Sequence, residues 1–166
     1  MQNAMQKIGV VFVSRRNSLR SVLAEACLLH LSQRFSVRSC GRPGEIARAV
    51  HPAALGALGS ASIPLPPIAL RSWDEFTRSG APRADLVITL DASIEPLQPR
   101  WPGQPDAALW PYPDVAAIDN AEEAAHAAIQ TLFSLRRRLE LLVNLPLHGL
   151  DRAAVRADVR DLAHLN

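Results

Sequence analysis

The chain has 166 residues, of which 48% are hydrophobic and 20% are charged, and its formal net charge is +2. This composition predicts one globular domain over residues 1–166, and the small net charge gives no reason to expect nucleic acid or a membrane as partner. No apolar run approaches the roughly 18 residues of a membrane-spanning helix and residues 1–7 do not resemble a leader, so we expect a cytoplasmic protein.

The chain contains two cysteines, Cys27 and Cys40. Two cysteines are too few for a disulfide framework and lack the regular spacing of a metal site. We therefore predict that both are small apolar core residues and that the protein has no metal and no cofactor.

The first predicted elements are a strand, a loop and a helix. Ile8–Val13 is a β-branched apolar run typical of a buried parallel strand, and no further apolar residue follows before Leu19. Apolar residues then recur at helical spacing, which predicts a helix from about Ser18 to Gln33. A short loop between a strand and a helix directs backbone amides and the positive end of the helix dipole at one point, where an anion can bind. Arg20 adds a planar bidentate donor to that point.

Residues 13–21, VSRRNSLRS, resemble the V-C-x-x-N-x-x-R-S signature of the low-molecular-weight protein tyrosine phosphatases and the related thioredoxin-coupled arsenate reductases. Asn17, Arg20 and Ser21 match the signature, whereas Ser14 stands at the position of the nucleophilic cysteine. The resemblance implies that Asn17 holds the loop in a strained shape, that Arg20 binds the substrate oxyanion and that Ser21 hydrogen-bonds the nucleophile. The anion-binding residues implied in this way are Arg15, Arg16, Asn17, Ser18, Leu19, Arg20 and Ser21.

The next segments give a strand at Phe35–Cys40 and a helix that starts near Pro52 and runs to about Leu58. His51 precedes this helix, and we interpret it as a capping residue rather than a general base. A proline-rich loop follows, and then a short helix from about Ser72 to Arg78. Its aromatic residues Trp73 and Phe76 either line the substrate cleft, as the resemblance implies, or pack in the core.

Asp85–Leu90 is the next predicted buried strand. In the arsenate reductases this strand leads to two redox cysteines, and the corresponding positions here hold Asp91 and Gln98. Reduction of arsenate by that route passes a disulfide among three thiols. Since Ser14, Asp91 and Gln98 supply none of them, we expect no arsenate reductase activity.

Ala107–Trp110 predicts a fourth strand, followed by the segment WPYPD. This segment resembles the family's W-G-x-P-D-P loop, and Asp114 matches the aspartate that acts there as general acid. The residue after it is Val115 rather than proline. Two interpretations of Asp114 remain open, a catalytic acid and a simple helix cap.

Two amphipathic helices complete the chain, at Asn120–Val143 and Asp151–Leu165. The basic run Arg136–Arg138 lies in the first of them and is predicted to be a solvated helix face, with a basic patch for a partner as the alternative.

The order of these elements predicts an α/β domain with a four-stranded parallel sheet and helices on both faces. The resemblance implies strand order 2-1-3-4, with the anion-binding loop at the carboxyl ends of the strands, where such sheets bind ligands.

We therefore expect a bacterial protein of phosphatase-like fold that binds phosphate, sulfate or a phosphorylated ligand. Its catalytic positions Ser14, Arg20 and Asp114 include an alcohol where a thiol is needed, which predicts a pseudoenzyme. Two alternatives stay open. One is an active tyrosine phosphatase whose cysteine was deliberately changed to serine, and the other is a non-catalytic scaffold or regulatory protein with a protein partner.

Overall fold

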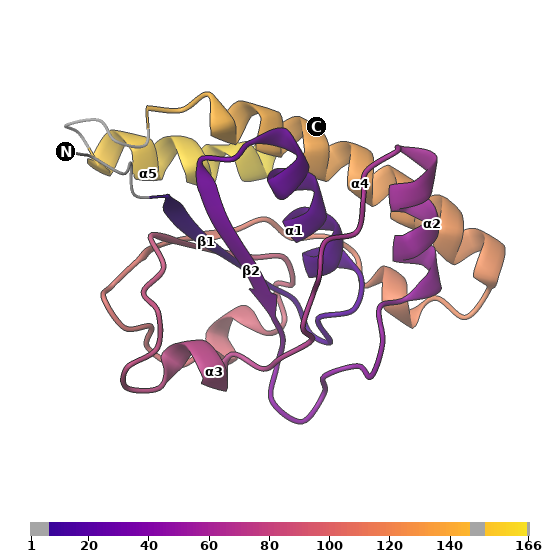
Figure 1. Cartoon of the computed structure of the whole chain (residues 1–166), viewed down its shortest axis with the longest axis horizontal. Helices are drawn as coiled ribbons and strands as arrows, with labels where there is room; N and C mark the ends of the chain where they lie inside the picture. The colour runs from indigo at the N-terminus through magenta and orange to yellow at the C-terminus, as the bar shows by residue number, and fades with distance from the viewer. Residues whose placement is uncertain (1–6, 147–151, 166) are drawn as a thin grey trace.

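The computed structural model describes residues 7–146 and 152–165. Its centre is a four-stranded sheet in the order β2-β1-β3-β4, in which all neighbouring strands are parallel (Figure 1). The strands are β1 (Ile8–Val13), β2 (Phe35–Cys40), β3 (Leu86–Thr89) and β4 (Asp106–Leu109). The predicted strand order is therefore confirmed.

Strand β1 lies in the middle of the sheet and is covered on both faces. Val10 and Phe12 belong to the main hydrophobic core, whereas Val11 and Val13 belong to a second cluster on the opposite face. Because side chains alternate across a strand, two covered faces require a continuous apolar sequence. This requirement explains the run of β-branched residues in β1.

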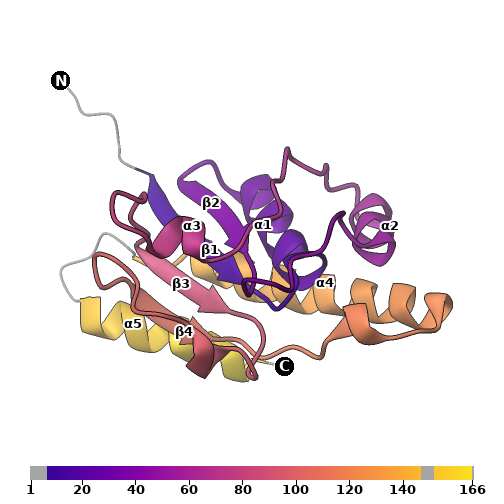
Figure 2. The same cartoon turned by 90° about the horizontal axis from the view of Figure 1, so that it is seen from below.

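Helices cover both faces of the sheet, as predicted (Figures 1 and 2). On one side lie α1 (Arg20–Leu31), α2 (Pro52–Ser60), α4 (Ala121–Val143) and α5 (Arg152–Asp161). The other side carries the short helix α3 (Asp74–Thr77), which packs near the second cluster. Short 3₁₀ turns occupy Glu95–Leu97, Val115–Ala117 and Leu162–His164.

Some element boundaries differ from the sequence-based expectations. Helix α1 begins at Arg20 rather than near Ser18, because Leu19 has φ −138° and ψ −74° and so lies outside the helical region. The loop after β1 is accordingly longer than expected. The predicted C-terminal helix ends as a 3₁₀ turn, and its expected first residue, Asp151, lies outside the described residues.

The start of α2 confirms the interpretation of His51. The His51 side chain accepts a hydrogen bond from the Ala53 amide at 3.0 Å, and Pro52 occupies the first helical position. A proline there loses no hydrogen bond, since the first amides of a helix have no partner within it.

The prediction of a solvated basic face on α4 is wrong for Arg138. This residue is only 8% exposed, and its Nη2 donates to the carbonyls of Ala163 and Leu165 at 3.1 Å each. Its guanidinium also lies 4.8 Å from the centre of the Tyr112 ring. Arg138 therefore joins the C-terminal segment to the loop after β4. Its neighbour Arg137 is exposed, as expected.

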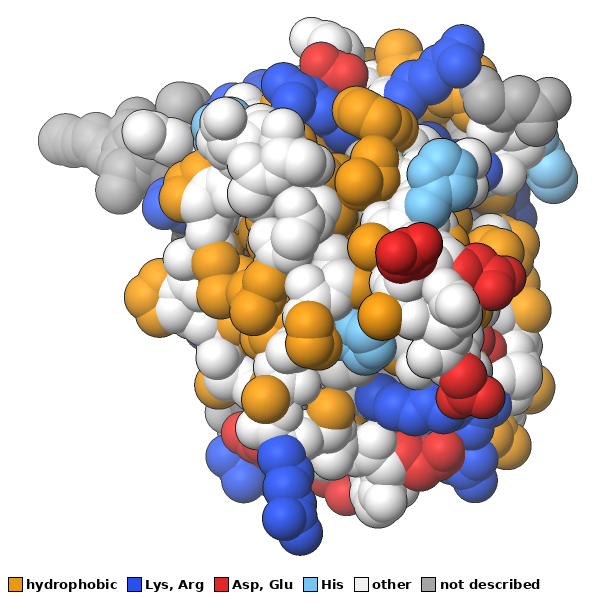
Figure 3. Space-filling model, turned by 90° about the vertical axis from the view of Figure 1, so that its right-hand side faces the viewer, with side chains coloured by type: hydrophobic (Ala, Val, Ile, Leu, Met, Phe, Trp, Pro, Cys, Tyr) orange, Lys and Arg blue, Asp and Glu red, His pale blue; other side chains and the backbone are white. Residues whose placement is uncertain are grey.

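The surface that carries α2 and the start of α4 shows hydrophobic side chains among white backbone and uncharged atoms, with a few acidic and histidine side chains beside them (Figure 3). Arginine or lysine and acidic side chains lie next to each other along its lower edge. Within the described residues, no helix combines the length and the apolar character needed to cross a bilayer.

Candidate oxyanion-binding site

Residues 14–19, here called the oxyanion loop, connect β1 to α1 at the carboxyl end of the sheet. The carbonyls of Arg15, Arg16 and Ser18 accept hydrogen bonds from the amides of Arg42, Ala47 and His51 at 2.8 to 3.0 Å. In a trans peptide the N–H points opposite to the C=O. The amides that follow these outward carbonyls therefore point to the opposite, inner side of the oxyanion loop.

Asn17 holds the oxyanion loop in shape from within. Its φ of 53° lies in the left-handed region, which asparagine tolerates better than most residues. Its side-chain Nδ2 donates to Ser21 Oγ and to Ser39 Oγ, both at 2.9 Å, and its Oδ1 accepts from the Arg71 amide at 3.0 Å. Both amide hydrogens of this buried side chain and one of the two acceptor positions of its Oδ1 are thus occupied.

Gly41 allows the oxyanion loop to pass close to the end of β2. A Cβ atom at this position would lie 2.9 Å from the Arg15 carbonyl oxygen and 3.0 Å from the Asn17 nitrogen. Both neighbours are backbone atoms of the loop, so neither yields easily. This packing role depends on the tertiary structure.

Ser14 lies directly after β1 and is 2% exposed. Its Oγ is 2.7 Å from Ser21 Oγ, a contact in which either hydroxyl can be the donor. Among the described residues, no histidine or carboxylate hydrogen-bonds the Ser14 hydroxyl. The position therefore lacks the neighbouring base that activates a serine nucleophile.

Glu25 is a buried acidic residue beneath the oxyanion loop that the sequence analysis did not identify. Ser39 Oγ donates to Glu25 Oε1 at 2.5 Å, which connects Glu25 through Ser39 to Asn17. Burial raises the pKa of Glu25, and the Ser39 hydrogen bond and the charges of Arg71 and Arg38 offset this effect only in part.

This raised pKa predicts a pH dependence of stability. The contribution of Glu25 is fully present below its ordinary pKa and is lost as pH rises through the higher folded-state pKa. Glu25→Gln keeps an oxygen acceptor for Ser39 without the titration, so we expect a smaller loss of stability as pH rises from about 4.5 into the neutral range. Urea denaturation across this range measures the effect, with the exposed Glu140→Gln as control. Equal pH dependence of the Glu25→Gln variant and the unmodified protein would contradict the prediction.

Arg20 is 3% exposed and lies among acceptors from two loops, those after β3 and β4. Its Nη1 donates to the carbonyls of Tyr112 at 3.0 Å and Leu90 at 3.5 Å. Its Nη2 donates to Asp91 Oδ2 at 2.8 Å and to Asp114 Oδ1 at 3.3 Å. The guanidinium is thus positioned at the oxyanion loop, but it is paired with two carboxylates of the chain itself.

Asp91 has a specific role that its position in the sequence did not reveal. Its Oδ1 accepts from the Ser93 amide at 2.9 Å and hydroxyl at 2.5 Å, while Oδ2 binds Arg20. Burial acts to raise the pKa of Asp91, but the hydrogen bonds from Ser93 and Arg20 and the Arg20 charge outweigh it, so this pKa lies below its ordinary value. Asp91 is therefore the ionised buried partner of Arg20.

The cap interpretation of Asp114 is wrong, because its side chain makes no capping hydrogen bond to the following turn. Instead Asp114 Oδ2 lies 2.9 Å and Oδ1 3.2 Å from Arg16 Nη1. Together with the contact to Arg20, this geometry places Asp114 between two arginines.

Arg15 forms a second group of contacts at the mouth of the site. Its Nη1 lies 3.1 Å from Glu45 Oε2, and its Nη2 donates to Ser93 Oγ at 2.5 Å. Arg42 also pairs with Glu45 at 3.1 Å. The arginines of the loop thus neutralise nearby carboxylates.

The hollow between Ser14, Arg16 and Asp114 is too narrow to hold a water molecule.

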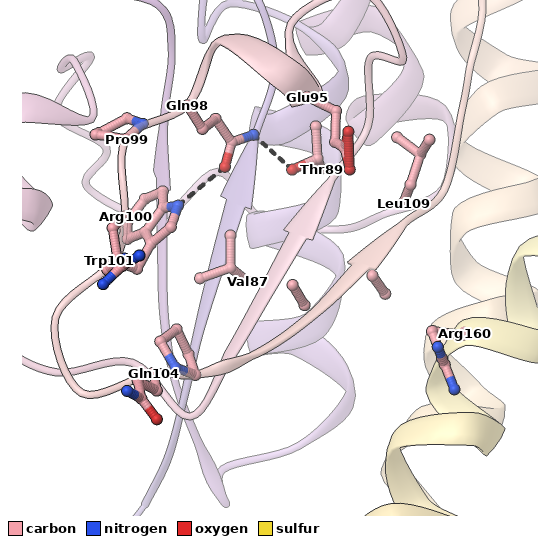
Figure 4. Close-up of a pocket in the computed structure, with 13 residues that line it drawn as sticks. Val87, Thr89, Glu95, Gln98, Pro99, Arg100, Trp101, Gln104, Leu109 and Arg160 are labelled. Carbon is pink, nitrogen blue, oxygen red and sulfur yellow. Dashed lines mark hydrogen bonds between the residues drawn. The ribbon is translucent and has the colours of Figure 1, made fainter.

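Gln98, which the resemblance matches to a redox cysteine of the arsenate reductases, makes structural hydrogen bonds. Its Nε2 donates to Thr89 Oγ1 at 2.7 Å, and its Oε1 accepts from Trp101 Nε1 at 2.9 Å (Figure 4). These contacts border an open hollow of about 630 Å³ over the outer face of β3 and β4. Ser14, Arg20 and Asp114 do not line this hollow, so it is separate from the oxyanion loop.

The remaining candidates lie in the core. Trp73 and Phe76 pack in the second hydrophobic cluster with Cys40, which favours packing over a cleft wall. Cys27 and Cys40 are buried, as predicted, and burial raises the pKa of the Cys27 thiol to about 11. Burial likewise raises the pKa of Cys40. Residues 7–146 and 152–165 contain no group of three His, Cys, Asp or Glu side chains arranged to hold a metal.

The fold and the site together define a class of protein. The protein is an α/β domain whose parallel sheet has the strand order 2-1-3-4. Its arginine-containing oxyanion loop joins the first strand to the first helix. Residues 9–103 match the family described as low molecular weight phosphotyrosine protein phosphatase. This match covers more than half of the chain, and the protein therefore belongs to that family.

Solved structures support the same fold. An arsenate reductase in the phosphate-binding state is 26% identical, with a TM-score of 0.64, over 82% of this chain and 96% of the other. The arsenate reductase from Archaeoglobus fulgidus DSM 4304 is 23% identical, with a TM-score of 0.63, over 82% of this chain and 99% of the other. A protein tyrosine phosphatase is 21% identical, with a TM-score of 0.62, over 84% of this chain and 98% of the other. Comparison with curated proteins gives no significant match.

Proposed function

We propose that this protein is a catalytically impaired member of its family that binds phosphate-type oxyanions at the oxyanion loop. The observation that carries the proposal is the state of the loop around Asn17. Asn17 keeps its left-handed conformation and its bonds to Ser21, Ser39 and Arg71, although the nucleophile position holds Ser14. The chain thus has the Asn17 contacts that shape the loop, but it has a serine rather than a cysteine at position 14.

The loss of catalysis follows from the chemistry of Ser14. A thiol has a pKa near 8.5, which loop amides and an arginine lower further, whereas an alcohol stays protonated and is a poor nucleophile. Ser14 contacts Ser21, another alcohol, rather than a base. Asp91 and Gln98 supply no redox chemistry, because their side chains are a carboxylate and an amide and not thiols.

The ligand class follows from the donors around the oxyanion loop. Inward amides, the N-terminus of α1 and the Arg20 guanidinium favour a compact oxyanion such as phosphate, sulfate or the phosphoryl group of a larger ligand. A relative of 26% identity is known in a phosphate-binding state, which supports phosphate as the ligand to test.

Phosphate should raise the melting temperature of the protein, because a ligand that binds the native state stabilises it by mass action. For a Kd of about 1 mM, 20 mM phosphate adds about 1.8 kcal/mol, or about 3 to 7 °C for a domain of this size. Chloride at equal ionic strength provides the control. Arg20→Ala should abolish the shift.

Arg20→Ala removes the nearest cation of the buried Asp91 carboxylate and leaves it only the more distant Arg15 Nε at 3.9 Å, which destabilises the fold. The double variant Arg20→Ala, Asp91→Asn removes the cation and its partner together and keeps the test possible. If phosphate stabilised this double variant as much as the unmodified protein, the binding site would lie elsewhere.

A further inference from the structure

Asp114 occupies the place in this structure where an oxyanion would contact arginine. Its carboxylate lies 2.9 Å from Arg16 Nη1 and 3.3 Å from Arg20 Nη2. Nη1 of Arg20 donates to the carbonyls of Leu90 and Tyr112, and Nη2 donates to the carboxylates of Asp91 and Asp114. An anion that binds Nη1 or Nη2 of Arg20 therefore competes with one of these acceptors.

Of the two carboxylates on Arg20, Asp114 is the one that is less firmly held. The Asp91 side chain is 8% exposed, lies 2.8 Å from Arg20 and also accepts two hydrogen bonds from Ser93. The Asp114 side chain is 28% exposed, lies farther from Arg20 and precedes a short 3₁₀ turn. Moving the Asp114 carboxylate away from Arg20 costs less than moving the Asp91 carboxylate, because Asp114 is already partly solvated and Asp91 is buried.

We propose, on the basis of the oxyanion-binding function above, that a phosphate-type dianion binds by displacing Asp114 from Arg16 and Arg20. Asp114 is then a built-in competitor of the ligand, and Arg16 is a second ligand-binding arginine of the site. In the free protein, Asp114 and Arg16 close the hollow over Ser14. In the complex the dianion takes over both guanidinium contacts, and the Asp114 carboxylate turns to solvent.

The exchange predicts that removing the competitor strengthens binding. Asp114→Asn should bind inorganic phosphate about tenfold more tightly than the unmodified protein, as measured by isothermal titration calorimetry at fixed ionic strength. Glu45→Gln is the matched control, since Glu45 is also a carboxylate at the mouth but pairs with Arg15 and Arg42 rather than Arg20. We expect at most a twofold gain there, because Glu45 is half-buried and does not contact Arg20, and because the effect of removing its charge is partly screened.

The role of Arg16 is tested in the Asp114→Asn variant, which lacks the carboxylate that pairs with Arg16. Arg16→Ala in the Asp114→Asn background should weaken phosphate binding about tenfold, because the ligand then loses one of two guanidinium contacts. Arg42→Ala in the same background is the control and should change the affinity little. Unchanged affinity after Arg16→Ala would show that Arg16 only covers the site.

The outcomes separate this inference from the proposed function. If the unmodified protein and the Asp114→Asn variant both fail to bind phosphate, oxyanion binding itself is wrong, and the exchange with it. If the unmodified protein binds phosphate and Asp114→Asn binds it no more tightly than Glu45→Gln, only the exchange is wrong. A gain specific to Asp114→Asn supports both.

Discussion

Replacement of Asn17 by alanine should lower the free energy of unfolding by about 3 kcal/mol. Asn17 is fully buried, and its loss leaves the Arg71 amide without this acceptor and removes one hydrogen bond each from Ser21 and Ser39, which keep their contacts to Ser14 and Glu25. A buried polar group left unpaired costs about 1 to 3 kcal/mol, and alanine is also about 1 kcal/mol less favourable than glycine at the φ of 53°. Urea denaturation measures the change.

The matched variant is Asn17→Gly, which accepts the left-handed backbone but also lacks the side-chain bonds. We expect it to be about 1 kcal/mol more stable than Asn17→Ala, so that the difference isolates the backbone term. Both variants should also lose the stabilisation by phosphate. A destabilisation below about 1 kcal/mol in Asn17→Ala would show that the loop keeps its shape without this side chain.

Ser14→Cys should convert the site from an inert one to a weakly active phosphatase. The inward amides, Arg20 and the α1 dipole stabilise a thiolate at this position, and the Ser21 hydroxyl is in place to hydrogen-bond it. We expect hydrolysis of an activated aryl phosphate such as p-nitrophenyl phosphate to rise by about 10² or more over the Ser14 protein. Arg20→Ala should remove this activity.

The recovery should be limited, because Asp114 is paired with Arg16 and Arg20 rather than free to protonate a leaving group. Adding Arg16→Ala to Ser14→Cys releases one of these contacts and tests whether the pairing limits the acid. Adding Asp114→Asn should lower turnover while phosphate still binds. A Ser14→Cys protein that binds phosphate but shows no turnover would mean that the site is organised for binding alone.

The sequence by itself determined the fold. The β-branched run of Ile8–Val13 and the helical spacing after it predicted the strand, loop and helix. The match at Asn17, Arg20 and Ser21 predicted an oxyanion-binding role for the loop, and this role stays a prediction. These features are local, because backbone preferences and the period of apolar residues act over a few neighbours. The strand order followed from the family resemblance, and the structure agrees with it.

Only the tertiary structure decided how the charged residues pair. Arg16 and Asp114 are 98 residues apart, Arg20 and Asp91 are 71 apart, and each pair meets because parallel strands bring their loops to the same edge of the sheet. The sequence placed these residues at that edge, but which carboxylate reaches which guanidinium depends on loop paths and side-chain rotamers. The Glu25–Ser39 contact and the burial of Arg138 could not be predicted from the sequence either. A charged residue in a helix gives no local sign of a partner that is distant in the sequence.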